Sequence, residues 1–309
     1  MTADLTMRPL NGPDELDLFC RFPYVLNDEL EGDLAHGRRR LDWMWVAQRG
    51  DQLIARAAWW TYRRGEDPAV LDVFDIADDA DPEDGEQLLR AAMTAVLPAG
   101  ATPPEAIRFV PPNWRDDEAV RRGVEACVAA LESTGARLFV ERLRLQWDAG
   151  TPVAPPTERL AFREPESREE LVGLMTTVLE GTLDAHSRAE LGGKPAAQVA
   201  AEQHDDEFLG YSSPRSWWRI ATLPDGNPIG FVIPARNAYN PILAYIGILP
   251  THRGKGYIDD VLAEGTRILA ANGAPRIRAS TDVGNVPMAR AFARAGYRTF
   301  ERQLNLVWT

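Results

Sequence analysis

The chain ends with "AFARAGYRTFERQLNLVW", residues 291–308, and a similar stretch, "ALESTGARLFVERLRLQW", occupies residues 130–147. Aligned without a gap, the two stretches share seven of eighteen residues, whereas average composition gives about one or two. Each pattern predicts an Ala-rich helix that ends at a glycine, followed by a strand with alternating apolar residues. The matched pairs are Ala130/Ala291, Gly135/Gly296, Arg137/Arg298, Phe139/Phe300, Leu143/Leu304, Leu145/Leu306 and Trp147/Trp308.

A second pair of segments supports the repeat. "WMWVAQRGDQLIARAAWW" from Trp43 and "WWRIATLPDGNPIGFVIPA" from Trp217 both predict strand, polar turn and strand. The Pro- and Gly-rich segment 149–157 predicts a linker. We therefore expect one fold to occur twice, as domains at 1–148 and 158–309.

The second half predicts the order β-α-α-β-β-β-α-β-α-β. Apolar "ILAYIGIL" (residues 242–249) is too short and too β-branched for a helix, whereas "DDVLAEGTRILAANG" (259–273) has helical spacing and ends at a glycine. The expected fold is α+β, with a mixed, mostly antiparallel sheet flanked by helices in each domain.

Composition restricts the partners. The formal net charge is -12, with 46 acidic and 34 basic residues, which disfavours nucleic acid as the main partner. Four histidines and two cysteines are scattered without metal-ligand spacing, so we expect no metal site. The sequence shows no signal peptide and no transmembrane segment, so we expect a cytoplasmic monomer or homodimer that handles a small molecule.

The stretch "GILPTHRGKGYIDDVL", residues 247–262, predicts a strand, a basic glycine loop and a helix start. The first amides of a helix have no intrahelical partner, and the helix dipole adds positive potential there. Gly254 and Gly256 allow successive N–H groups to converge, and Arg253 and Lys255 add charge. The loop therefore predicts a site for an anion the size of a diphosphate, although such a loop can also simply connect a strand to a helix.

The loop, together with "NVPMARAFARAGY" (residues 285–297), resembles the two cofactor motifs of the GNAT family of acyl-CoA N-acyltransferases. The tandem layout is similar to that of mycothiol synthase-like proteins within the family. The resemblance implies acetyl-CoA or another acyl-CoA as co-substrate. It also implies roles for backbone amides of Ile248 and Leu249 toward the pantetheine and the thioester, for Asn285 toward the pantetheine and for Phe292 in packing on the cofactor. The implied pyrophosphate-binding residues are Arg253, Gly254, Lys255, Gly256, Tyr257 and Ile258.

The sequence departs from the family pattern where the family often has catalytic residues. Phe292 replaces a tyrosine acid, and strand 242–249 has no carboxylate base. The remaining candidates for proton transfer are Tyr245, Asp282 and His186, the last within "TLDAHSRAEL" (182–191). Each also has a structural interpretation, as a core tyrosine, a turn-forming aspartate and a solvated helix end.

The first half lacks the basic loop. Its matching segment, "DDADPEDGEQLL" (residues 78–89), places carboxylates at the start of a helix. They suit the helix dipole but would repel a diphosphate. We expect this half to bind no CoA and either to have a structural role or to wall the acceptor pocket. We expect Arg38, Arg39 and Arg40 to form a solvated basic face.

These features predict an acyl-CoA-dependent N-acyltransferase that acetylates a small amine by direct attack in a ternary complex, since no cysteine or serine stands out as a nucleophile. The alternative is a CoA-binding or structural tandem protein without catalysis, because the tyrosine and the carboxylate are missing. Aminoacyl transfer from a charged RNA is a third interpretation, which the net charge disfavours.

Overall fold

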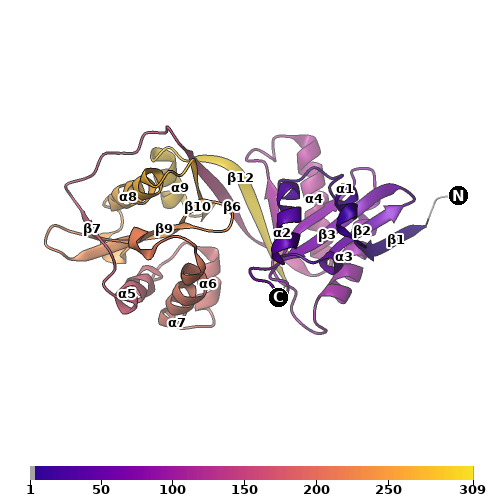
Figure 1. Ribbon diagram of the computed structural model, residues 1–309, viewed down its shortest axis with the longest axis horizontal. Coiled ribbons are helices and arrows are strands. Elements are labelled where there is room, and N and C mark those ends of the chain that lie inside the picture. Colours follow the sequence, from indigo (N-terminus) through magenta and orange to yellow (C-terminus); the bar gives the residue numbers. More distant parts are fainter. Residues whose placement is uncertain (1–3, 309) are drawn as a thin grey trace. The chain divides into compact units, whose positions relative to one another are not determined.

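The structure is a computed structural model that describes residues 4–308. The chain divides into two compact units (Figure 1). Unit 1 comprises Met1–Glu141 and Arg302–Thr309, and unit 2 comprises Arg142–Glu301. Each unit is described by itself below.

The units exchange the ends of two strands, which changes the predicted boundaries of 1–148 and 158–309. Strand β6 (Ala136–Asp148) begins in unit 1, but its residues from Arg142 onward pair with a strand of unit 2. Strand β12 (Arg298–Trp308) begins in unit 2, but its residues from Arg302 onward pair with a strand of unit 1. Sequence order alone could not reveal this exchange, because both strands have the same apolar alternation.

Unit 1 has the strand order β1-β2-β3-β4-β5-β12. Its pairings are antiparallel except between β4 and β5, which run parallel. Its strands are β1 (Leu5–Pro9), β2 (Met44–Arg49), β3 (Gln52–Trp60), β4 (Val70–Ile76) and β5 (Ala106–Val110), with the end of β12. Its helices are α1 (Leu16–Phe19), α2 (Leu30–His36), α3 (Pro82–Val96) and α4 (Glu118–Ser133).

Unit 2 has the strand order β6-β11-β10-β9-β8-β7, with a parallel pairing only between β10 and β11 among the described strands. Its strands are the end of β6, β7 (Ala161–Arg163), β8 (Arg219–Thr222), β9 (Pro228–Arg236), β10 (Pro241–Ile248) and β11 (Arg276–Asp282). Its helices are α5 (Arg168–Val178), α6 (Ala185–Leu191), α7 (Ala196–Glu202), α8 (Tyr257–Ala271) and α9 (Val286–Arg294). The predicted order omitted α6, a short helix that begins one residue after its cap Asp184.

Helices cover both faces of the sheet in unit 2. Buried residues of α8 and α9 form one core with β11 and β6, and buried residues of α5 and α7 form another core against β8 and β9. Figure 1 shows α8 and α9 on one side of these strands and α5, α6 and α7 on the other. Unit 1 likewise has one core under α3 and α4 and another under α1 and α2. The α+β fold with a repeated mixed sheet is confirmed.

Local sequence explains how the repeated helices end. Gly135 follows α4 with φ 98°, and Gly296 follows α9 with φ 82°. Both angles lie in the left-handed region, where a side chain adds strain and glycine does not. The shared glycine predicted from the repeat therefore has the same conformational role in both copies.

Candidate active site

Strands β10 and β11 part soon after they meet. They pair in parallel register only at Ile242 and Arg278, whereas β10 continues alongside β9 as far as Ile248, opposite Gly230. A β-bulge in β10 between Leu243 and Tyr245 accompanies the divergence, and bulges bend a strand locally. One edge of β10 is therefore left without a neighbouring strand at its carboxyl end.

The direction of the β10 backbone groups follows from one hydrogen bond. Leu249 N–H donates to the Ile229 carbonyl oxygen at 2.8 Å, so Leu249 faces β9. Because successive residues of an antiparallel strand face opposite edges, Ile248 and Ile246 direct their backbone groups away from β9, toward the diverging β11. This corrects the expectation for Leu249, whose amide is already bonded, and adds Ile246 to the exposed edge.

Gly247 lies between these two isoleucines and allows α5 to approach the strand. A Cβ atom at this position would lie 2.5 Å from Val178 Cγ1, closer than side-chain atoms pack. The glycine therefore fixes the distance between α5 and the end of β10.

The loop after β10 presents backbone amides. Gly254 and Gly256 have φ of 75° and 78°, and a Cβ at either would meet nothing within 4 Å. Gly256 is the N-cap of α8 and has no side chain to occupy the first helical amides. Among the described residues, none accepts a hydrogen bond from the amides of 254–258. This is the geometry of a backbone anion site at a helix start.

Arg253 holds the loop in place rather than offering its charge. Its guanidinium donates to the backbone carbonyls of Ile248 (Nε, 3.0 Å), Glu180 (Nη1, 2.7 Å) and Val178 (Nη2, 2.7 Å). Its own amide donates to Pro250 at 3.3 Å. The side chain thus ties the end of α5 to the end of β10, and its predicted role as a cation at the anion site is not supported.

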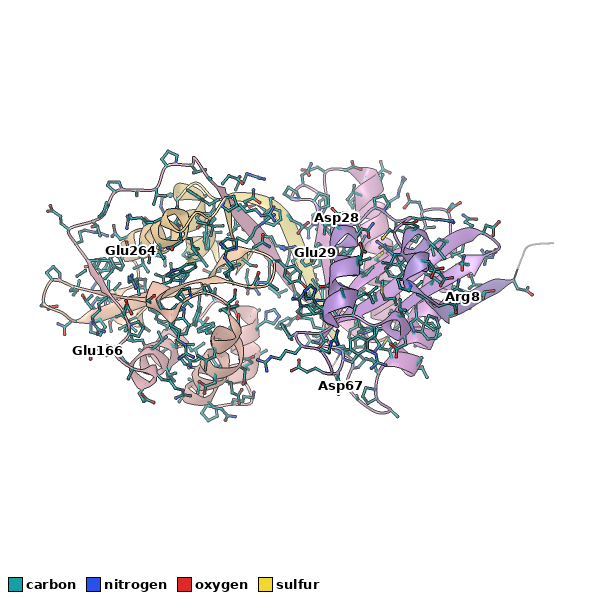
Figure 2. All side chains as sticks on the ribbon, in the orientation of Figure 1. Arg8, Asp28, Glu29, Asp67, Glu166 and Glu264 are labelled. Carbon is teal, nitrogen blue, oxygen red and sulfur yellow. The ribbon has the colours of Figure 1, made fainter. Side chains whose placement is uncertain are left out.

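Carboxylates near the loop are already neutralised. Asp259 and Asp260 lie in the first turn of α8, the helix marked by Glu264 in Figure 2. Asp259 pairs with Arg294 at 2.6 Å, and Asp260 pairs with Arg159. Lys255 is exposed in the loop and makes no hydrogen bond or ion pair with the described residues. The local charge therefore favours an anion in spite of the acidic chain.

The second motif is split between the surface and the core. Asn285 caps α9, its Oδ1 accepting from Met288 N–H at 3.3 Å, and is half-buried. Phe292 is only 2% exposed and packs edge-on against Tyr297 at 5.0 Å. Tyr297 in turn bonds to Thr266 Oγ1 at 2.8 Å. Phe292 is therefore a core residue, and its contact with a cofactor stays a prediction.

Asp282, at the end of β11, is the best-defined acid. It is 3% exposed, and its Oδ2 accepts from Ala185 N–H at 2.7 Å. Arg142 Nε, from β6, lies 3.1 Å from Oδ1. Burial raises the pKa of Asp282, and the Asp184 carboxylate adds to this, although the Ala185 amide, Arg142 and His186 oppose it. A partly desolvated carboxyl with a raised pKa is suited to accept a proton.

The structure brings His186 near this carboxyl, and it brings Tyr245 within the electrostatic influence of the neighbouring Asp184. His186 lies in the first turn of α6, close enough for its charge to act on Asp282. Tyr245 packs edge-on against Phe231 at 5.2 Å. Burial raises the pKa of Tyr245, and Asp184 and Glu207 raise it further while Arg253 lowers it. The Tyr245 hydroxyl is therefore a proton donor at neutral pH and not a base.

Sequence reasoning missed two charged residues here. The predicted boundary places Arg142 in the first domain, and no local pattern connects it to Asp282 or Asp184. In the structure its Nη2 lies 3.5 Å from Asp184 Oδ2. Glu207 lies in a π-helical turn (Gln203–Glu207) after α7 and accepts a hydrogen bond from Tyr211. Desolvation raises the pKa of Glu207, although the residue is exposed at the surface.

A groove of about 750 Å³ lies elsewhere, in unit 1. Its lining is mostly apolar, and its two arginines are engaged, Arg39 with Asp72 and Asp33 and Arg40 with Asp42. Arg39 is 2% exposed, so the predicted solvated basic face is wrong for this residue.

The comparisons with known proteins agree with this geometry. Residues 179–297 match the sequence profile of the Acetyltransferase (GNAT) family. The matched residues all lie within unit 2. No curated protein matches the chain significantly in sequence.

Solved structures match over nearly the whole chain. A GCN5-related N-acetyltransferase from Sphaerobacter thermophilus superimposes with a TM-score of 0.57 at 14% identity, covering 99% of this chain and 96% of its own. A tandem GNAT protein from the clavulanic acid biosynthesis pathway gives 0.53 at 14% identity and 98% coverage of both chains. A GCN5-related N-acetyltransferase from Kribbella flavida gives a TM-score of 0.52 at 15% identity, covering 90% of this chain and 94% of its own. The tandem GNAT fold is therefore established for both units.

Within residues 4–308, the helices are too short or too polar to cross a membrane.

Proposed function

We propose that unit 2 transfers an acyl group, acetyl in the first instance, from acyl-CoA to the amine of a small molecule. The observation that carries the proposal is the unpaired edge of β10 next to the unpaired amides of residues 254–258. The loop amides and Lys255 would bind the diphosphate. The backbone groups of Ile246, with the side-chain amide of Asn285, would bind the pantetheine arm, since the Ile248 carbonyl is already bonded to Arg253. When bound, acyl-CoA supplies an activated thioester carbonyl.

The residues of unit 2 then divide the remaining work. The Ile248 amide would stabilise negative charge on the carbonyl oxygen as an oxyanion donor. Asp282 would accept the proton of the attacking amine, and Arg142 would keep the Asp282 carboxylate oriented. Tyr245, whose raised pKa keeps it protonated, would donate a proton toward the leaving thiol. Attack is direct, because no cysteine or serine lies among these residues.

The test is calorimetric titration of acetyl-CoA followed by a thiol-release assay with a panel of amines. We expect one acetyl-CoA per chain and amine-dependent thiol release. No heat with acetyl-CoA would refute the proposal.

The alternative is a tandem protein that binds CoA without catalysis, and the phenylalanine at position 292 favours it. Binding of acetyl-CoA without turnover across a broad panel of amines would support this alternative.

A further inference from the structure

One face of unit 2 beyond Asp282 is rich in arginine. Along β11, Ile277 and Ala279 pack toward α8 and α9, so the alternate residues Arg278, Ser280 and Asp282 face the opposite side. On the adjacent β6, their register partners are Gln146, Arg144 and Arg142. The same face therefore leads from the candidate base to Arg278, four residues and about 13 Å along the strand.

Arg278 makes incomplete use of its donors. Its guanidinium lies 3.6 Å from the centroid of the Phe300 ring. Its Nε and Nη1 atoms are covered, yet neither has a hydrogen-bond acceptor. A covered donor without an acceptor costs about 1–3 kcal/mol, so such groups usually have a partner, either in the protein or in a ligand.

The charges around Arg278 leave a positive excess. Burial and the charges of Arg276, Arg144 and Arg298 together lower the pKa of Arg278 to about 10, with Glu301 opposing them. Glu301 is the opposing charge, but it is already bonded to Arg144, which also lies 5.3 Å over Phe300. An anion placed on this face would therefore meet uncompensated positive charge.

We propose that this face binds an anionic group of the amine acceptor, a carboxylate or a phosphate, with Arg278 as the anchor and Phe300 as the surface beneath it. The proposal rests on the proposed function for the role of the amine. It narrows the acceptor to molecules whose anion stands several bonds from the amine, because Arg278 and Asp282 are separated along β11. The planar guanidinium fork suits both carboxylate and phosphate.

The first test needs no catalysis. Inorganic phosphate and succinate are titrated calorimetrically into the wild-type chain, Arg278→Gln and the matched control Arg276→Gln. Arg276 lies on the same strand and face but is exposed, and its Nε already donates to Asn240 at 2.9 Å. We expect binding to weaken at least about 10-fold in R278Q and to change little in R276Q. The tighter of the two probes identifies the anion.

Arg278→Lys separates charge from geometry, since it retains the cation and loses the fork. We expect it to bind the probes with an affinity between those of the wild type and R278Q. Acetyl-CoA is titrated into every variant, and unchanged affinity shows that unit 2 is folded. If acetyl-CoA does not bind the wild-type chain, the proposed function fails, whereas the phosphate and succinate titrations still decide whether Arg278 holds an anion.

The second test uses matched acceptors, glucosamine 6-phosphate against glucosamine and 4-aminobutyrate against 4-aminobutyramide. We expect kcat/KM to favour the charged member of at least one pair by about 10- to 100-fold in the wild type. R278Q should lose this preference through KM, with the uncharged acceptor unaffected. Equal use of charged and uncharged acceptors, or equal anion binding by the wild type and R278Q, would overturn the inference.

Discussion

Strands β4 and β5 of unit 1 diverge just as β10 and β11 of unit 2 do, but the two divergences are filled differently. In each unit the parallel strands share a single register pair, Leu71 with Ala106 and Ile242 with Arg278. In each, the preceding hairpin carries a bulge. The backbone has been preserved in both copies, so the difference must lie in the side chains.

In unit 1, side chains take the place of a ligand. Arg108, on β5, donates to the Phe74 carbonyl of β4 at 2.9 Å and to the Asp75 carboxylate at 2.6 Å. The Phe109 amide donates to the Tyr24 hydroxyl at 2.9 Å. The diverging edges are thus joined by buried polar groups of the chain itself. In unit 2 no described strand pairs with the equivalent edge of β10 at its carboxyl end, and on that edge Arg253 bonds only the Ile248 carbonyl.

The N-termini of α3 in unit 1 and α8 in unit 2 also differ in whether the chain itself occupies their backbone amides. The Asp81 carboxylate caps α3 by accepting from Glu83 N–H at 3.0 Å. In unit 2 the corresponding cap is Gly256, which leaves the amides unpaired. A carboxylate that belongs to the chain therefore occupies in unit 1 the kind of position that the proposed function gives to a diphosphate in unit 2.

The largest expected effect concerns the candidate base. Asp282→Asn retains an oxygen for the Ala185 amide but cannot accept a proton. We expect kcat to fall about 100- to 10,000-fold with acetyl-CoA affinity unchanged, as measured by thiol release and calorimetry. Ser280→Ala, on the same strand and face, is the control. A kcat within threefold of the wild type would remove Asp282 from the mechanism.

The next effect concerns the buried pair of Arg108 and Asp75 that joins β4 and β5 in unit 1. Burial alone would raise the pKa of Asp75, but the charges of Arg108 and Arg56 outweigh it and lower the pKa. Arg108→Leu leaves Asp75 with one cation, so we expect a loss of about 3 kcal/mol in unfolding free energy at neutral pH. The contribution of Asp75 is present above about pH 4 and declines as the pH falls through its lowered value.

Urea denaturation of R108L measures this loss, with Arg115→Leu as the exposed control. The stoichiometry of acetyl-CoA binding sharpens the comparison. It should stay at one per chain in R108L, since Asp81 still caps α3. A second bound acetyl-CoA would show that the contacts of Arg108 alone prevent binding in unit 1.

A smaller effect is expected from the glycines at the two ends of α8. Gly256 and Gly273 have φ of 78° and 76°, and a Cβ at either meets nothing within 4 Å. Alanine should therefore cost about 1–2 kcal/mol of stability at each position. Only Gly256→Ala should also weaken acetyl-CoA binding, by about 10-fold. Equal affinities of the two variants would mean that the loop amides do not contact the cofactor.

The smallest effect is a shift in pH dependence. A base must be deprotonated, so kcat/KM should rise with pH through the raised pKa of Asp282. Arg142 opposes that rise in pKa, and Arg142→Gln should therefore move the acid limb to higher pH. Profiles from about pH 5 to pH 9 with a neutral acceptor would show this, and Arg144→Gln is the control. If the acid limb of the kcat/KM profile does not move in R142Q, Arg142 does not influence the titration of Asp282.

Much of the fold was predictable because local signals repeat. The glycine after α4 and α9 and the polar turn between β8 and β9 each have a local physical cause, and the structure has both. The loop glycines were likewise visible in the sequence. What local patterns could not supply was pairing between distant segments, such as Arg142 with Asp282 or Arg39 with Asp72.

The same limit explains the errors at the site. Arg253 in a basic glycine loop suggested a phosphate ligand, but its acceptors, the carbonyls of α5 and β10, are known only from the folded chain. The choice between Ile246 and Leu249 depended on the β-bulge and on one backbone bond to Ile229. The alternation of residues along the strand was predictable. Which residues at the end of β10 direct their backbone groups toward β9 was not.

The exchanged strand ends bear on why the chain retains its first repeat. The segment Arg142–Asp148 is encoded with the first repeat, yet it supplies the strand next to β11 and the cation beside Asp282. A gene shortened to the second repeat would lose both, exposing a bare sheet edge prone to aggregation. Selection on the second repeat would therefore also preserve the first, even if the first never binds a ligand.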